Sequence, residues 1–214
     1  MNGCFRGFLF GLAGLLVAVP SFAGPSLCDA IAGNLVQNCG FESGNFNDWF
    51  IADPSGFYGV DSPGENSGNY YAALGAYNGD GSLGPTVPLV TVPGQTYIFS
   101  FYLTNLLGGD VDNPNDFSAD WAGITLLSLT NAPIMPYTHY SFTETATSTA
   151  TTIGFTERND ASFWGLDDVS VVPVDPGGVP EPSTMLLMAT GLIGVGLGHR
   201  AFRRRVAVPA GIRN

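Results

Sequence analysis

Few side chains in this sequence could act as a catalytic nucleophile or base. Between residues 24 and 174 there is one histidine, His139, one arginine, Arg158, and no lysine. The sequence contains no Gly-x-Ser-x-Gly or His-Glu-x-x-His motif and no glycine-rich phosphate loop. His139 lies between Tyr137 and Tyr140 in a run typical of a strand, where we expect a surface histidine. We therefore predict that the protein is not an enzyme.

Carboxylates are the other possible source of chemistry, because two acids that flank a glycosidic bond can hydrolyse it. Asp167 and Asp168 are adjacent in a run typical of a strand. Successive side chains of a strand point to opposite faces, so we do not expect these two acids to flank one bond. A glycosidase that uses other acids is the less favoured alternative, since the sequence singles out no pair.

Aromatic side chains are candidates for carbohydrate binding, because sugar rings stack on exposed aromatic faces. The available rings are Phe57, Tyr58, Tyr77, Trp121 and Trp164, and the candidate ligand-binding residues among them are Tyr58, Tyr77, Trp121 and Trp164. Large aromatic residues also dominate the interiors of β-sandwiches, so the core is the alternative place for each of these rings. Trp49 is expected in the core.

The elements that position these residues are expected to be strands. Short runs of β-branched and aromatic residues alternate with clusters of Gly, Pro, Asn and Asp, which is typical of an all-β sandwich. The expected strands are Tyr70–Leu74, Thr96–Leu103, Ala122–Leu129, His139–Thr143, Thr151–Thr156 and Gly165–Val172. The residues expected to share one face are Tyr97, Phe99, Phe101 and Leu103. Pro173 cannot donate to a ladder, so the last strand should end at Val172.

The charges are unevenly distributed along the chain. All eighteen acids lie between Asp29 and Glu181, and six of the seven arginines lie outside that range. An acidic domain repels phosphate backbones, so we predict no nucleic-acid partner.

Residues 1–23 have the features of a secretory signal peptide. Arg6 is their only charged residue, and Phe8–Val19 is an apolar run. Ser21 and Ala23 are small residues at the −3 and −1 positions of a cleavage site. We predict cleavage after Ala23 and export, with a retained membrane anchor as the alternative.

Residues 175–214 fall into consecutive parts. A linker, residues 175–182, contains Pro180-Glu181-Pro182, whose prolines restrict the backbone to extended conformations. Residues 183–205 begin with an uncharged run just long enough for a single transmembrane helix. This run is followed by an arginine cluster, which comprises Arg200, Arg203, Arg204 and Arg205. We expect the cluster to stay in the cytoplasm. Residues 206–214 form a tail.

The order Val-Pro-Glu-Pro, hydrophobic span and arginine cluster, from Val179 to Arg205, resembles the PEP-CTERM sorting signal of Gram-negative bacteria. The resemblance implies an exosortase-type membrane protease as a partner and processing near Pro180, Glu181 and Pro182. It also implies export across the inner membrane to the cell surface or the extracellular matrix. The tail after Arg205 is longer than is usual in the family, and a permanent membrane anchor is the alternative.

Asn34–Gly44, followed by Trp49, resembles the first strand of jelly-roll carbohydrate-binding modules, and Leu166–Val171 resembles their last strand. Ser67–Ala72 and Pro93–Tyr97 also fit that family, in the right order. The resemblance implies a jelly-roll β-sandwich over residues 24–174. It also implies association with an extracellular polysaccharide.

The same resemblance implies a structural calcium ion, held by the acid of the first-strand motif and an aspartate of the last strand. The candidate ligands are Glu42, Asp167 and Asp168, and calcium needs six to eight oxygen atoms. Strand alternation does not decide which aspartate faces Glu42. In the alternative interpretation, these acids cap turns or pair with backbone amides.

Cys28 and Cys39 remain after removal of the signal peptide, an even pair in an oxidising compartment. We predict a disulfide that pins the N-terminal segment to the first strand, with two separate thiols as the alternative. The favoured function is that of an exported, non-enzymatic surface or matrix protein associated with polysaccharide. A structural or adhesive protein without sugar affinity is the main alternative.

Overall fold

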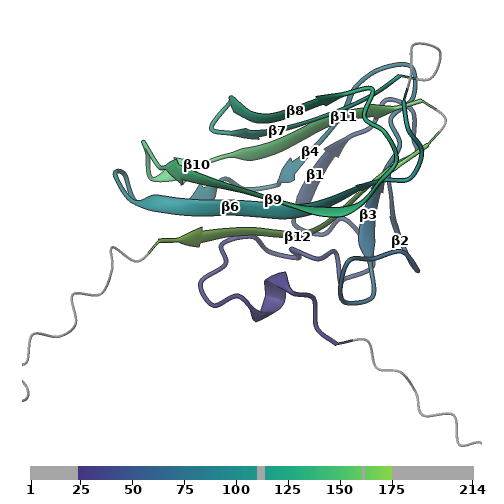
Figure 1. Cartoon of the computed structure of the whole chain (residues 1–214). Coiled ribbons are helices and arrows are strands. Elements are labelled where there is room, and N and C mark those ends of the chain that lie inside the picture. Colours follow the sequence, from purple (N-terminus) through teal and green to yellow (C-terminus); the bar gives the residue numbers. More distant parts are fainter. Residues whose placement is uncertain (1–23, 110–113, 161, 175–214) are drawn as a thin grey trace, which may run out of the picture. The chain divides into compact units, whose positions relative to one another are not determined.

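The computed structural model describes residues 24–109, 114–160 and 162–174, which form a β-sandwich (Figure 1). The predicted signal peptide, linker, transmembrane helix and arginine cluster lie outside the described residues. Within the described part of the chain, no helix is long and apolar enough to cross a membrane. The all-β sandwich that the sequence predicts is confirmed.

The first five-stranded sheet has the strand order β1-β4-β11-β7-β8. Its neighbouring strands pair antiparallel. The strands are β1 (Trp49–Ala52), β4 (Gly81–Pro85), β11 (Ile153–Asn159), β7 (Asn115–Trp121) and β8 (Ile124–Thr130).

The second five-stranded sheet has the order β2-β3-β12-β6-β9, which brings the last strand of the sandwich into its centre. The strands are β2 (Gly59–Asp61), β3 (Tyr71–Leu74), β12 (Trp164–Pro173), β6 (Thr96–Asn105) and β9 (Met135–Thr145). A short pair, β5 (Leu89–Val90) and β10 (Ala150–Thr151), and a 3-10 turn, η1 (Cys28–Ala30), complete the described elements.

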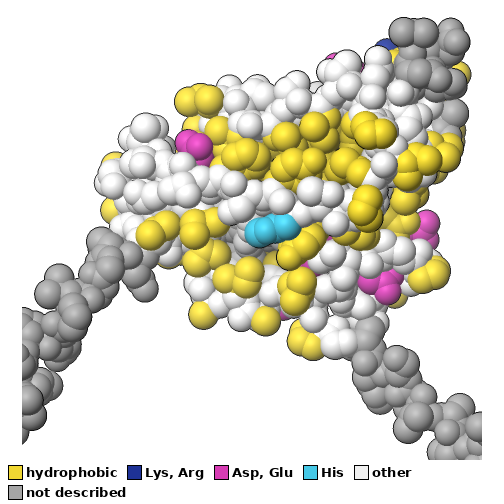
Figure 2. All heavy atoms as spheres, in the orientation of Figure 1, with side chains coloured by type: hydrophobic (Ala, Val, Ile, Leu, Met, Phe, Trp, Pro, Cys, Tyr) yellow, Lys and Arg dark blue, Asp and Glu magenta, His cyan; other side chains and the backbone are white. Residues whose placement is uncertain are grey.

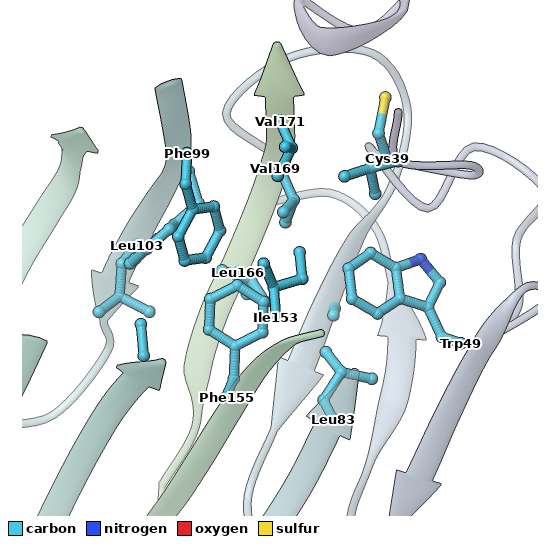
Figure 3. Close-up of a cluster of buried hydrophobic side chains, with 14 of the residues drawn as sticks. Cys39, Trp49, Leu83, Phe99, Leu103, Ile153, Phe155, Leu166, Val169 and Val171 are labelled. Atoms are coloured by element: carbon cyan, nitrogen blue, oxygen red, sulfur yellow. The ribbon is translucent and has the colours of Figure 1, made fainter. Parts of the chain in front are cut away.

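The core lies between the two sheets and is rich in aromatic rings. The four residues predicted to share a face of β6 are all buried. Phe155 of β11 contacts the rings of Phe99, Phe101 and Phe117 at centroid distances of 5.9, 5.1 and 5.8 Å. Figure 3 shows how side chains from both sheets meet in this cluster. Burial of one such side chain contributes about 1.5–3 kcal/mol to the free energy of unfolding.

Several strand boundaries differ from the predicted ones. Ala122 and Gly123 have positive φ values of 51° and 79°, so they form the turn between β7 and β8 instead of starting a strand. The last strand runs one residue further than predicted, to Pro173. The segment 34–44, predicted as the first strand, forms turns, because Asn38 and Phe41 have φ values of 48° and 59°.

The N-terminal segment nevertheless follows the last strand, as Figure 1 shows below β12. The backbone N–H of Leu35 donates to the carbonyl of Val171 (2.9 Å), and that of Val169 donates to Cys39 (2.9 Å). The disulfide between Cys28 and Cys39 is present, as predicted. A loop of this length is expected to contribute about 3 kcal/mol by restricting the unfolded chain. The disulfide therefore fixes the N-terminal segment against β12.

β12 departs from simple alternation at Asp168, whose φ is 51°. Leu166, Val169 and Val171 are all fully buried and lie in one cluster with Phe99 and Phe155 (Figure 3). Leu166 and Val169 are three positions apart, so a regular strand would send them to opposite faces. Asp168, which lies between them and has a positive φ, rotates the strand, so that Val169 and Val171 face the core as Leu166 does.

The edge strands β8 and β9 belong to different sheets and lie on the same side of the molecule in Figure 1. Figure 2 shows apolar side chains along this side, above the exposed ring of His139. His139 stacks on Tyr102 of β6 at a centroid distance of 4.7 Å. The structure thus places this histidine at the surface, as expected from the sequence.

Candidate functional site

A cavity of ≈ 320 Å³ opens where β3 and β11 end and β12 begins. This volume lies at the lower end of the range for small-molecule sites. The lining residues are Phe57, Gly75, Tyr77, Asn159, Ser162 and Phe163, and we call this site the aromatic pocket. The side chains of Phe57 and Tyr77 are 55% and 46% exposed, so their rings are available to a ligand from solvent.

Gly75 allows the ring of Phe163 to form part of this lining. A Cβ atom at Gly75 would lie 2.6 Å from two atoms of the Phe163 ring and 3.0 Å from the carbonyl of Ser162. Contacts below 3.0 Å force a neighbour to move, so a larger residue here would displace the ring. The shape of the pocket therefore depends on glycine at position 75.

The loop that carries Phe57 is held by Asp53. Its carboxylate accepts hydrogen bonds from the backbone N–H of Ser55 (2.9 Å), the Ser55 hydroxyl (2.7 Å) and the backbone N–H of Tyr58 (2.6 Å). Burial acts to raise the pKa of Asp53, but these hydrogen bonds outweigh it and leave that pKa below its ordinary value. Asp53 therefore stays charged and holds the loop at neutral pH.

The loop that carries Tyr77 is held by the end of β11. The Ala76 N–H donates to Glu157 Oε1 (3.0 Å), and the Asn159 N–H donates to the Ala76 carbonyl (2.9 Å). The Asn78 N–H donates to Asp160 Oδ1 (3.0 Å). Hydrogen bonds to the backbone on both sides of Tyr77 thus hold the loop that presents its ring.

The surroundings of the aromatic pocket are negatively charged. Arg158 is the only lysine or arginine between Gly24 and His199 in the sequence. Its guanidinium donates to both carboxylate oxygens of Asp160 and forms a salt bridge with it. Burial and the charge of Asp80 raise the pKa of Asp116, which Arg158 partly offsets. Acids therefore outnumber the one arginine in this region.

The structure separates the four predicted ligand-binding rings. Tyr77 lines the aromatic pocket, whereas Tyr58 is half-buried and directs its hydroxyl into the interior. Trp121 and Trp164 are 3% and 0% exposed and belong to the core, because they face inward from β7 and β12. These two tryptophans offer no ring face to a ligand at the surface.

Sequence reasoning missed four of the lining residues, Gly75, Asn159, Ser162 and Phe163. Asn159, Ser162 and Phe163 surround the turn between β11 and β12, and no periodic pattern marks them. Gly75 directly follows β3, but only its contact with Phe163 shows why glycine is required. The pocket results from the meeting of three loops far apart in sequence.

A second cavity of ≈ 370 Å³ lies between residues 34–37 and 85–90. It is lined by Val87, Pro88, Leu89 and Val90, by polar residues such as Gln37, and by no aromatic residue. Without a ring for stacking, this cavity is the weaker candidate for a sugar site.

Asp167 and Asp168 both direct their carboxylates to the turn at Asn66 and Ser67. Asp167 Oδ2 accepts the N–H groups of Asn66 (2.8 Å) and Ser67 (3.2 Å). Asp168 accepts the Asn66 side-chain amide (2.8 Å), the Ser67 hydroxyl (2.8 Å) and the Cys28 N–H (3.1 Å). The expectation that these acids point to opposite faces is wrong, because the positive φ of Asp168 breaks the alternation.

Burial raises the pKa of Asp167 to about 8, with a further contribution from the neighbouring charge of Asp168. The backbone N–H groups of Ser67 and Asn66 act in the opposite direction. Glu42 binds a neighbouring part of the same loop: its carboxylate accepts the N–H groups of Asn69 (2.9 Å) and Tyr70 (3.2 Å).

The three predicted calcium ligands do not form a fitting set of oxygen atoms for the ion. Each carboxylate faces N–H or O–H donors, whose hydrogen atoms occupy the positions that a cation would need. Glu42 and the two aspartates also hold different residues of the loop. The geometry matches the alternative interpretation, in which these acids pair with a turn, and calcium binding stays a prediction.

Among the described residues, one group of three potential metal ligands lies close together: Cys28, Asp29 and Cys39. Both sulfur atoms belong to the disulfide. Metal binding by cysteine needs thiolates, so this group is no metal centre while the disulfide is intact.

Comparison with known proteins identifies the tail and the fold separately. The PEP-CTERM protein-sorting motif matches residues 178–205. The chain therefore ends in a PEP-CTERM motif, as the sequence predicts. This motif implies an exported protein that is processed by exosortase and reaches the cell surface. No curated protein sequence matches the chain.

Solved structures with a similar fold include carbohydrate-binding modules. TmCBM61, solved in complex with β-1,4-galactotriose, matches with a TM-score of 0.50 at 16% identity, over 66% of this chain and 99% of that module. The CBM22-1 xylan-binding domain from Paenibacillus barcinonensis Xyn10C has a TM-score of 0.45 at 18% identity, over 69% of this chain and 99% of that one. The cellulose-binding domain from Cellulomonas fimi β-1,4-glucanase C has a TM-score of 0.43 at 17% identity, over 64% and 95%. At such identities the likeness shows the fold alone.

Proposed function

We propose that this protein binds an extracellular polysaccharide through the aromatic pocket, after export and processing of its PEP-CTERM tail. The observation that carries the proposal is the pair of exposed rings, Phe57 and Tyr77, beside the inner ring of Phe163. Aromatic faces stack against the apolar faces of sugar rings, and Asn159 and Ser162 add polar atoms to the same lining.

The proposed ligand class is a neutral or amino-sugar polysaccharide. Among the residues that the structure describes, no charged side chain lines the pocket, and the neighbouring Arg158 is already paired with Asp160. A polymer of uronic acids or of sulfated sugars would therefore meet the acids of this region without a cation to balance them. Positive amino sugars would be attracted by the same acids.

We propose binding without catalysis. TmCBM61, a carbohydrate-binding module with a similar fold, was solved in complex with an oligosaccharide. The acids near the pocket have structural partners: Asp53 holds one loop, and Glu157 and Asp160 hold the other. Export supplies the location, because a PEP-CTERM protein reaches the cell surface, where polysaccharides are present.

The decisive experiment uses the full chain and a panel of neutral, amino-sugar and acidic polysaccharides. We expect Phe57→Ala and Tyr77→Ala each to lower affinity at least about tenfold, as loss of a stacking ring does. Phe50→Ala is the matched control, because Phe50 is 59% exposed on β1 but does not line the pocket. All three variants should keep the stability of the wild type, since these rings are exposed.

Three outcomes would contradict the proposal. Binding that survives both pocket substitutions would show that the sugar site lies elsewhere on the domain. No binding to any polysaccharide in the panel would favour a structural or adhesive surface protein without sugar affinity. Turnover of an oligosaccharide would instead reveal a glycoside-active enzyme.

A further inference from the structure

Glu157 supports both loops that carry the exposed rings of the aromatic pocket. Its Oε1 accepts the N–H of Ala76, which lies between Gly75 and Tyr77. In the register of β4 and β11, Glu157 is opposite Gly81. A Cβ atom at Gly81 would overlap the hydroxyl of Tyr58, so this hydroxyl sits over that glycine. Since Tyr58 follows Phe57, one carboxyl group supports both loops.

The contact between Glu157 and Tyr58 is incomplete. Glu157 is fully buried, and neither its Oε2 nor the Tyr58 hydroxyl has a well-formed hydrogen bond among the described residues. A buried polar atom without a partner costs about 1–3 kcal/mol. A neutral carboxyl can accept the Ala76 N–H with one oxygen and pair with the Tyr58 hydroxyl through the other, and unlike the carboxylate it does so without burying a charge.

The groups that face Glu157 include both hydrogen-bond donors and acids. They are the Ala76 N–H after β3, Tyr58 and Asp53 from the loop before β2, and Asp116 from β7. Burial is the largest influence and raises the pKa of Glu157 to about 7, and the charges of Asp116 and Asp53 act in the same direction. The nearby Tyr58 hydroxyl and the Ala76 N–H oppose this shift but do not cancel it.

We propose that Glu157 is a proton-sensitive positioning residue: its neutral carboxyl holds the two loops ready for ligand, and its anion releases them. The effect on affinity rests on the proposed function, whereas the effect on the loops does not. Ionisation places a charge where no cation is available, and opening of the loops to water relieves that cost. The pocket is therefore ordered below neutral pH and loosens above it.

Hydrogen exchange of the full chain tests the loops without any ligand. If the opened state gives Glu157 its ordinary pKa of 4.5, protection of the segment 75–77 should fall about tenfold between about pH 6 and about pH 8, after correction for intrinsic exchange. Glu157→Gln should abolish this fall, because the amide is neutral at every pH and offers both an acceptor and a donor. Glu144→Gln removes a negative charge from β9 as a control and should retain the fall.

The same variants separate the two proposals when a polysaccharide from the panel binds. Affinity of the wild type should decrease over that pH range, by at most about tenfold when the loops are mostly open, and affinity of Glu157→Gln should stay constant. If no polysaccharide binds, the proposed function fails, but the exchange data still decide the role of Glu157. Identical pH profiles of wild type and Glu157→Gln in the exchange experiment would overturn the inference.

Discussion

Asp167 and Asp168 are consecutive residues of β12, yet both carboxylates accept hydrogen bonds from the same turn at Asn66–Ser67. The left-handed backbone of Asp168 makes this possible. Asp168 also accepts the N–H of Cys28, so one side chain joins the last strand, the turn before β3 and the disulfide-bonded N-terminal segment.

Asp168→Ala should strongly destabilise the fold. The change leaves the Cys28 N–H, the Ser67 hydroxyl and the Asn66 amide without their acceptor in a buried place, which we expect to lower the free energy of unfolding by about 3 kcal/mol. Asp61→Ala is the control, because Asp61 is exposed and accepts only the N–H of Ser62. Chemical denaturation measures the free energy of unfolding of both variants. Equally small losses of stability would contradict the role assigned to Asp168.

Calcium should have little effect on stability. Because Glu42, Asp167 and Asp168 already accept N–H and O–H donors, we expect the same melting temperature in calcium and in a chelator. Thermal unfolding of the full chain under both conditions is the measurement. A calcium-dependent rise that Glu42→Gln removes would show that the ion binds after rearrangement of the loop, as the resemblance to carbohydrate-binding modules implies.

The sequence predicts the sandwich well because its signal is local. Tyr97, Phe99, Phe101 and Leu103 alternate with more exposed residues, and all four are buried. The same argument fails for β12, where one residue with positive φ changes the face of every side chain after it. Aspartate tolerates this conformation better than most residues, but sequence alone does not show that it adopts it.

The aromatic pocket was harder to predict, because it depends on contacts between distant loops. Tyr77 is among the predicted rings, whereas the ring of Phe163 fits into the pocket lining only because Gly75 has no side chain. Trp121 and Trp164 were plausible by residue type, but their strand positions face the core. Residue type alone does not separate a ring that fills a core from one that lines a pocket.

Gly75→Ala should damage the pocket and the fold together. The new methyl group would lie 2.6 Å from the Phe163 ring, so the ring must move, at a cost of about 1–3 kcal/mol in stability and with loss of polysaccharide binding. Gly79→Ala is the matched control from the same loop, because a Cβ atom there meets nothing within 4 Å. Denaturation and binding assays should show no loss for Gly79→Ala; equal behaviour of the two variants would refute the packing argument.

Glu181→Ala should prevent removal of the C-terminal tail. Glu181 is the only acidic or basic residue between Asp175 and His199, and it lies within the matched sorting motif. Intact-mass analysis of membrane and medium fractions should show wild type without residues 1–23 and without the part of the tail beyond Pro180–Pro182. The variant should keep its tail, whereas Asp175→Ala, outside the matched residues, should be processed normally. A full tail in every wild-type fraction would indicate a permanent anchor instead.

Glu157→Gln should stabilise the domain at neutral and alkaline pH. Burial raises the pKa of Glu157 from 4.5 to about 7, so folding favours its neutral form. The stabilising effect of that form is complete below the unfolded pKa of 4.5, and it is lost as the pH rises through about 7. The wild type should therefore lose about 3 kcal/mol relative to the variant over this range, and little more at higher pH. Denaturant titrations at several pH values measure the difference in free energy of unfolding between wild type and Glu157→Gln. The contribution of the other acids cancels in this difference. Glu144→Gln is the charge control. A constant difference across the whole range would mean that Glu157 keeps one protonation state, and the proton-sensitive support would then be wrong.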